Sequence, residues 1–194
     1  MAGHFEALPG GGAAVALDEV EISILRSLAV QLMELIGPGD EPVEGEDPLA
    51  ALFAEGPSEP PSDPALRRLF PDAYGDDSDE LRQAAADFRR FTENDLRARK
   101  RDDALAVVRT LDALASTAAG EGGGILKLTA DESRCWLGAL NDLRLTIGTR
   151  LEVTDDDESE RLYRLPDSDP RKPMVMAYLW LGGLQESLVA TLMP

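Results

Sequence analysis

The stretch LNDLRLTIGTRL, residues 140–151, combines a helical apolar pattern with polar residues on the same side. At about 100° per residue, the following side chains share one face: Leu137, Leu140, Arg144, Ile147 and Leu151. Asn141 and Gly148 lie beside this face, whereas Asp142 and Thr146 are predicted to point away from it. A guanidinium that faces the core is costly unless a hydrogen-bonding partner meets it.

A helix predicted over residues 18–36 offers that partner. Glu21 follows the capping residue Asp18 at capping-box spacing, and it lies in line with the leucines of the same helix. We therefore predict that Glu21 pairs with Arg144 across the bundle, with Asn141 satisfying the remaining hydrogen bonds. In the alternative, these three residues bind a small anionic ligand or the substrate of an enzyme.

The other elements give the fold class. Residues 4–17 fit a β-hairpin with a glycine turn, and residues 125–129 fit one further short strand. Residues 79–116 are free of proline and helical in pattern, and a break into two helices at residues 92–95 or 102–103 is the alternative to one long helix. Residues 172–192 form a last helix that is apolar nearly all round. Because a helix without a polar face belongs in the interior, we expect this last helix at the centre. The prediction is a mainly α protein, a bundle of about five helices with a small N-terminal β-hairpin.

We interpret residues 1–194 as a single helical domain. Residues 37–77 form an insertion rich in proline, glycine and acids, which we expect to be partly mobile because it can bury little apolar surface. Two apolar islands interrupt it, at residues 48–54 and 65–74. A tethered acidic loop is favoured, and the alternatives are short helical turns that dock on the body or a motif that folds on a partner.

The helix over residues 79–116 carries both aromatic and basic residues. An apolar side is predicted for Ala84, Phe88, Phe91 and Leu96. The basic residues between Arg89 and Arg101 alternate with acids, which is typical of a solvated helix with local ion pairs. A DNA-binding surface is the alternative, but a net charge of -18 argues against a nucleic-acid partner.

Residue types restrict the chemistry. Cys135 is the single cysteine and His4 the single histidine, so an intrachain disulfide and a thiol-based zinc cluster are excluded. The acidic stretch at residues 154–160 lacks the alternation and the central glycine of an EF-hand. We therefore expect no metal, no cofactor and no catalytic residue set.

Cys135 is a candidate redox residue through a disulfide between chains or a reversible modification. Helical phase places it near Asp131 and Asp142, and nearby acids raise a thiol pKa. An inert cysteine is therefore the favoured interpretation.

Membrane insertion is not expected. The longest apolar run, MVMAYLWLGGL from Met174, is shorter than the roughly 20 residues that a membrane span needs. The first residues lack a basic end followed by an apolar stretch, so no signal peptide is expected. The sequence predicts a soluble cytoplasmic protein.

Two segments, WLGALNDLRLTIGTRL at residues 136–151 and YLWLGGLQESLV at residues 178–189, resemble an actinobacterial family of unknown function that includes an oxidative-stress regulator (AosR-like). The resemblance implies a cytoplasmic, largely helical accessory protein. It also implies redox-responsive control of transcription through protein partners, and genes beside a Clp protease adaptor and a sulfur-carrier route to cysteine. Sensing by an intramolecular dithiol cannot carry over, because Cys135 stands alone.

Composition and resemblance together favour a non-enzymatic regulatory or adaptor protein that acts through protein contacts, linked to oxidative stress or cysteine metabolism. A small-ligand binder or enzyme that uses the Arg144 region is the runner-up, ahead of a DNA-binding regulator. A homodimer is compatible with each of these functions.

Overall fold

The computed structural model describes residues 3–37, 56–117, 122–153, 162 and 164–193. In this part of the chain the helices are α1 (Glu19–Ile36), α3 (Pro64–Leu69), α4 (Asp79–Thr117), α5 (Ala130–Arg150) and α7 (Lys172–Leu192). The strands are β1 (Glu6–Ala7), β2 (Ala13–Asp18) and β3 (Gly123–Leu128). The predicted mainly α fold with about five helices is confirmed. The predictions for residues 48–54 and 154–160 lie outside the described residues.

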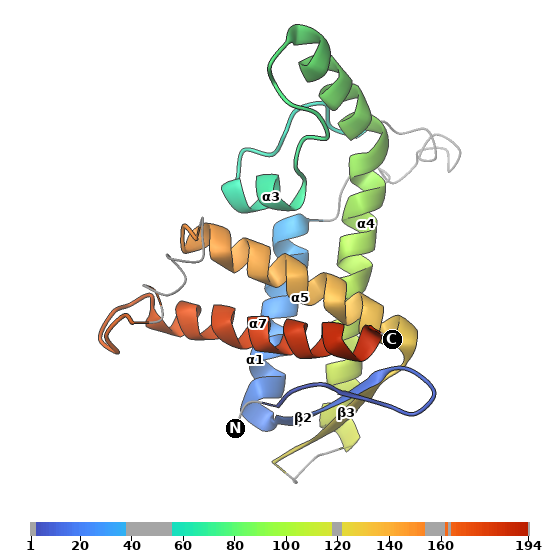
Figure 1. The fold of residues 1–194 in the computed structure, drawn as a ribbon, viewed down its shortest axis with the longest axis vertical. Coiled ribbons are helices and arrows are strands. Elements are labelled where there is room, and N and C mark those ends of the chain that lie inside the picture. The colour runs from blue at the N-terminus through green and yellow to red at the C-terminus, as the bar shows by residue number, and fades with distance from the viewer. Residues whose placement is uncertain (1–2, 38–55, 118–121, 154–161, 163, 194) are drawn as a thin grey trace, which may run out of the picture.

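A small antiparallel sheet of order β1-β2-β3 covers one end of the helices (Figure 1). Gly10, Gly11 and Gly12 all have positive φ, which glycine adopts without a steric penalty, and they turn the chain from β1 into β2. Val15 pairs with Leu126, and both side chains are buried. The predicted hairpin and the further strand are therefore both confirmed.

Local capping signals fix where the helices begin. Asp18 and Glu21 form the predicted capping box of α1, and Thr129 and Glu132 form a second one at the start of α5. Asp63 caps α3 by accepting hydrogen bonds from two backbone N–H groups.

The centre of the bundle is α5 and not, as predicted, α7. Helix α5 packs against α1, α3, α4, α7 and β3, whereas α7 packs against α5 and β1 (Figure 1). Met174 and Met176 of α7 are exposed, while Asp142 and Thr146, expected to point away from the core, are buried in α5. The prediction was wrong because an apolar composition does not determine how many neighbours a helix has. A helix with neighbours on several sides buries polar residues too.

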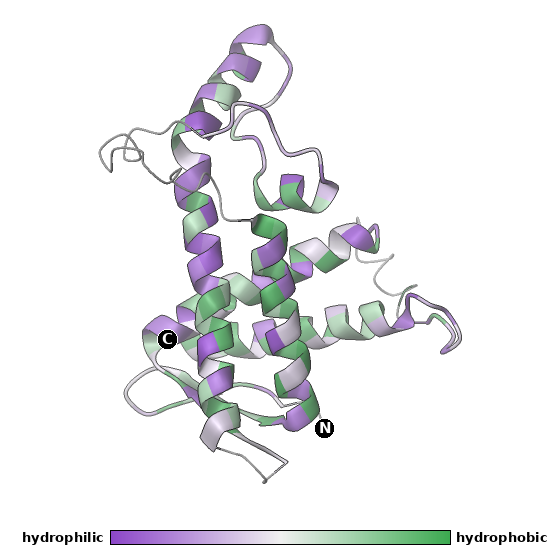
Figure 2. Cartoon of the chain, turned by 180° about the vertical axis from the view of Figure 1, so that it is seen from behind, coloured by the Kyte–Doolittle hydropathy of each residue, from purple (hydrophilic) through white to green (hydrophobic). Residues whose placement is uncertain are grey.

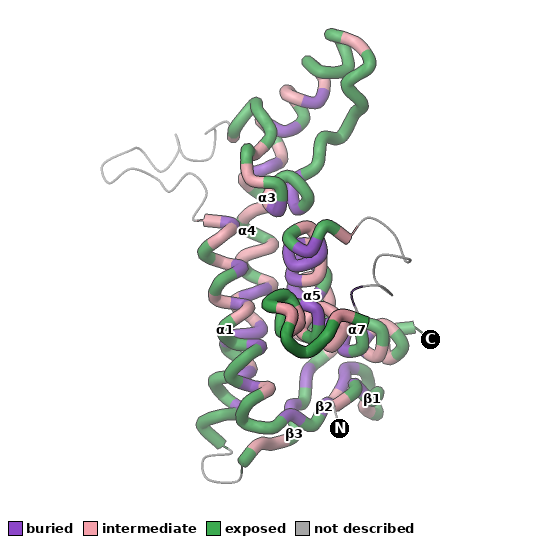
Figure 3. The backbone as a smooth tube through the Cα atoms, turned by 90° about the vertical axis from the view of Figure 1, so that its left-hand side faces the viewer, coloured by how far each residue is buried: buried purple, intermediate pink, exposed green. Residues whose placement is uncertain are grey.

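Helix α4 is continuous over 39 residues and reaches well beyond the other helices. Its second half packs on the body through Ala104, Val107, Val108 and Leu111. Its first part, residues 79–97, extends past the body, and we call it the arm (Figures 1 and 3). The arm is mostly hydrophilic, in contrast to the apolar body (Figure 2).

Candidate functional site

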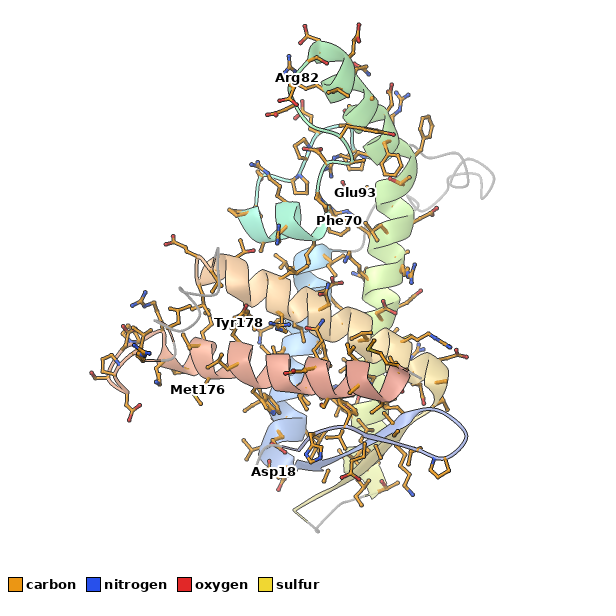
Figure 4. All side chains as sticks on the ribbon, viewed as in Figure 1. Asp18, Phe70, Arg82, Glu93, Met176 and Tyr178 are labelled. Carbon is orange, nitrogen blue, oxygen red and sulfur yellow. The ribbon has the colours of Figure 1, made fainter. Side chains whose placement is uncertain are left out.

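Arg144 lies on α5 and faces α7. Its Nη1 donates a hydrogen bond to Gln185 Oε1 at 2.6 Å, and its guanidinium carbon lies 5.4 Å from the centre of the Tyr178 ring. Tyr178 is placed between the two helices (Figure 4). Among the described residues, Arg144 has no ion pair, and its Nε is buried without a hydrogen-bond partner. The charge is met by an amide and an aromatic ring rather than by a carboxylate.

The predicted pair between Glu21 and Arg144 is not formed. Glu21 Oε2 instead accepts a hydrogen bond from the backbone N–H of Asp18 at 3.0 Å, as part of the capping box. The buried stripe of α1 runs through Ile22 and Leu25, so Glu21 lies at its edge, near the sheet. Asn141 does lie near Arg144 and is exposed, with its Oδ1 accepting a 3.4 Å hydrogen bond from Gln185 Nε2.

Two hollows flank Arg144. The first, of about 660 Å³, is lined by Gly182, Gln185 and Glu186 of α7. The second, of about 440 Å³, is lined by Arg68 of α3 and Glu152 after α5. Arg144 and Tyr178 line both. The space expected for a ligand beside Arg144 therefore exists, but without Glu21 and with acidic residues in both walls.

Two glycines at the contact between α5 and α7 lie close to side chains of the other helix. Gly148 lies against the ring of Tyr178, where an added side chain would come within 3.2 Å of the ring. Gly182 faces the guanidinium of Arg144, and no described atom other than the local backbone approaches Gly183.

A buried ion network joins the arm to the loop after α3. Arg89 and Glu93 are only 4% and 3% exposed, and they form an ion pair. Arg89 Nη2 also donates to Asp72 Oδ1 and to the Phe70 carbonyl oxygen, both at 2.9 Å, and Arg97 Nη2 donates to Glu93 Oε1 at 2.7 Å. The predicted solvated helix was wrong here, because residues 70–72 cover this face; Phe70 and Glu93 lie between α3 and α4 (Figure 4).

A second buried pair connects α4 with α5. Lys100 Nζ donates to Asp142 Oδ1 at 2.6 Å. Burial raises the pKa of Asp142 above its ordinary value, and the hydrogen bond and charge of Lys100 oppose that increase. Sequence reasoning missed Asp142 because helical phase alone placed it opposite the apolar stripe.

Cys135 is half-buried on α5, opposite Asp103 of α4. Burial raises the pKa of the Cys135 thiol, and a hydrogen bond to Asp103 and the charges of Asp103, Asp131 and Asp102 act in the same direction. The expected direction of the pKa is confirmed. The main acidic neighbour is Asp103 on another helix, whereas Asp142 was expected to contribute. Fewer thiolate anions at neutral pH mean a less reactive cysteine.

Phe91 lies on the opposite side of the arm from the ion network, whereas Phe88 lies at the edge of the network, beside Tyr74 of the loop after α3. Phe88 is 49% exposed and Phe91 is 65% exposed, although both were predicted to form a packed apolar side. Phe91 lies two residues from both Arg89 and Glu93, and residues at that spacing point to different sides of a helix. We give the name outward face to four exposed side chains, Leu81, Phe88 and Phe91 of the arm and Tyr74 of the loop before it.

We searched the described residues for a metal site and for a membrane-spanning helix. In that part of the chain, no group of three or more His, Cys, Asp or Glu side chains is arranged to hold a metal ion. None of the helices described there has both the length and the apolar character to cross a membrane.

Comparison with known proteins identifies relatives over most of the chain. A Mycobacterium leprae protein whose name refers to the oxidative stress regulator AosR is 34% identical over 184 residues, which cover 89% of this chain and 79% of that protein. The oxidative stress regulators AosR of Mycobacterium bovis and Mycobacterium tuberculosis are 31% identical over 176 residues, covering 89% of this chain and 78% of theirs. No solved structure matches.

The model of the family described as "Domain of unknown function (DUF2017)" matches residues 2–192. The expected resemblance is thereby confirmed, since the relatives carry the name of the expected regulator. The chain therefore belongs to the DUF2017 family.

Proposed function

We propose that this protein is a non-enzymatic regulator that acts in the cytoplasm by binding a partner protein through the outward face of the arm. The observation that carries the proposal is the exposure of Phe88 and Phe91 on a helix that extends beyond the body. The names of the mycobacterial relatives support a regulatory role linked to oxidative stress.

The chemistry of the outward face suits a protein interface. The rings of Tyr74 and Phe88 meet edge to face, with centroids 6.2 Å apart, and Arg90 lies over the ring of Phe91 at 5.0 Å. Aromatic and arginine side chains contribute most to binding energy at protein interfaces, and they are enriched there. Large aromatic surfaces in water favour burial against a partner.

The buried ion network holds the arm against the loop after α3 and so helps to fix the position of the outward face. Arg89 binds the loop after α3 through Asp72 and the Phe70 carbonyl group, so the loop and the arm are held together. Tyr74 follows this loop and contacts Phe88. A surface that is ordered before binding loses less entropy on association.

DNA binding receives less support. Four of the six basic residues between Arg89 and Arg101 make ion pairs and are therefore less available to phosphates: Arg89, Arg90, Arg97 and Lys100. A heparin column at low salt checks this point, and we expect no retention.

Affinity capture tests the proposal. The full chain and its Phe91→Ser variant are incubated with extract of the native organism, with and without peroxide. Val20→Ser serves as the control, because Val20 is also 65% exposed but lies on α1, away from the arm. A partner retained by the wild type and by Val20→Ser but lost with Phe91→Ser is the expected result. Equal retention by all three contradicts the assignment of the surface, and a concentration-dependent dimer by light scattering would identify a second copy as the partner.

The hollows beside Arg144 favour a second candidate function, the binding of a small anion. Arg144 and Arg68 line one hollow, and Arg144 has no ion pair among the described residues. Titration with citrate, compared between the wild type and Arg144→Gln, tests it. Binding that the variant lacks supports this function, and no binding by the wild type rejects it for this anion class.

A further inference from the structure

A separate cavity of about 650 Å³ lies between α1, α5 and α7. This volume falls within the range of small-molecule sites, about 300–1,000 Å³. Its apolar lining comes from all three helices: Leu28, Leu32 and Leu35, Leu143 and Ile147, and Met174. Such walls suit the apolar body of a ligand.

Thr146 contributes an unusual hydroxyl to this cavity. It is 8% exposed, lines the cavity, and its Oγ1 has no hydrogen-bond partner in the described structure. Other helical threonines donate to a carbonyl oxygen one turn earlier, as Thr149 does to Leu145 and Thr110 to Ala106. A buried hydroxyl without a partner is unfavourable, so a bound molecule that supplies one is stabilised.

Arg150 is the positively charged residue that lines the same cavity. It lies four residues after Thr146, so both side chains are on one side of α5, and it lines the cavity without an ion pair among the described residues. Glu34 lines the α1 wall and Gln31 adds an amide. The charges of Arg150 and Glu34 offset each other, which disfavours ligands with several negative charges, so a bound anion has only Arg150 as its ionic partner.

We propose that this cavity binds a small monocarboxylate with an apolar body, such as a medium-chain fatty acid. The chain lies among the leucines, the carboxylate pairs with Arg150, and a carboxylate oxygen accepts the hydrogen bond of Thr146. The site is independent of the Arg144 hollows, because Arg144 and Thr146 are two residues apart and lie on different sides of α5.

Calorimetric titration of the full chain with octanoate tests the proposal. Thr146→Val keeps the shape of the side chain and removes the hydroxyl, and Arg150→Gln removes the charge. We expect each to weaken octanoate binding by about 10-fold, the equivalent of one good hydrogen bond or ion pair. Thr149→Val is the matched control, since its hydroxyl bonds within the helix and lines a different hollow, and we expect a change below about 2-fold.

Two further measurements show which group of the ligand is recognised and where the ligand binds. Octanol should bind with the same dependence on Thr146 but none on Arg150, and octylamine should bind more weakly than both. Octanoate should shift the methyl NMR signals of Leu143 and Ile147 and leave those of the exposed Ile125 unchanged. Should Thr146→Val lose its fold, Thr146→Ala, which also removes the hydroxyl, and Arg150→Gln decide the question. Undetectable octanoate binding, or binding that neither variant weakens, overturns the proposal.

Discussion

The body and the arm bury opposite kinds of side chain. In the body, Trp136 and Leu140 of α5 are enclosed by apolar neighbours from several helices and the sheet. In the arm, Arg89 and Glu93 are enclosed instead, while Phe88 and Phe91 face water. Both patterns occur along one helix, α4, which has a conventional apolar interior only in its second half. Burial is therefore decided by which face another segment covers, and not by which face is apolar.

Removal of the carboxylate at the centre of the arm should have the largest effect. Glu93→Gln leaves Arg89 and Arg97 as buried cations without their shared anion. We expect a loss of about 3–5 kcal/mol in the free energy of unfolding, measured by urea denaturation. Asp95→Asn, an exposed position on the same helix, is the control. A loss below about 1 kcal/mol for Glu93→Gln contradicts the buried network.

Truncation in the body tests the conventional core. Leu140→Ala removes a fully buried side chain that the surrounding helices cannot easily replace. The expected loss is about 3 kcal/mol in the same measurement, from lost burial and the cavity that remains. Val20→Ala, at an exposed site, should change stability by less than about 0.5 kcal/mol. Equal losses of stability for Leu140→Ala and Val20→Ala would show that α5 is not at the centre of the bundle.

Features set by neighbouring residues were predictable from the sequence, and those set by distant segments were not. The capping box of Asp18 and Glu21 and the glycine hairpin depend on residues a few positions apart. The burial of Arg89 depends on the loop at residues 70–72, and the hydrogen bond of Arg144 depends on Gln185 of α7. Asp142 and Gln185 carried no signal of their own, because their partners lie on other helices. Helical phase identifies residues that share a face, but not what covers that face.

The contribution of Asp142, the buried carboxyl group of the body, to stability is expected to depend on pH. Because the pKa of Asp142 is raised in the folded state, the folded protein holds this proton more tightly than the unfolded chain. The contribution of Asp142 to stability therefore improves as the pH falls from 7 toward its ordinary value of 3.8. In Asp142→Asn this titration is absent, and the pKa of Asp103 loses only the contribution from the charge of Asp142, since burial is the main cause of its increase. We expect wild-type stability to improve relative to the variant on acidification, and an opposite trend contradicts the raised pKa.

The smallest effect on stability is expected at the outward face. Phe91→Ser removes a ring that lies mainly in water, so the free energy of unfolding should change by less than about 0.5 kcal/mol. A Phe70→Ser variant provides the contrast, since the same residue type is buried there against Arg97 and should cost about 3 kcal/mol or more. Comparable losses for both variants would show that the outward face is packed.

Hydroxyl-radical footprinting of the wild-type protein tests most directly whether the arm exposes its phenylalanine side chains to water. Among the described residues, phenylalanine lies at two buried positions, Phe5 and Phe70, and at two exposed ones, Phe88 and Phe91, so these four have the same intrinsic reactivity. We predict rapid oxidation of Phe88 and Phe91 and slow oxidation of Phe5 and Phe70. Protection of Phe88 and Phe91 to the level of Phe70 in the isolated monomer would contradict the account.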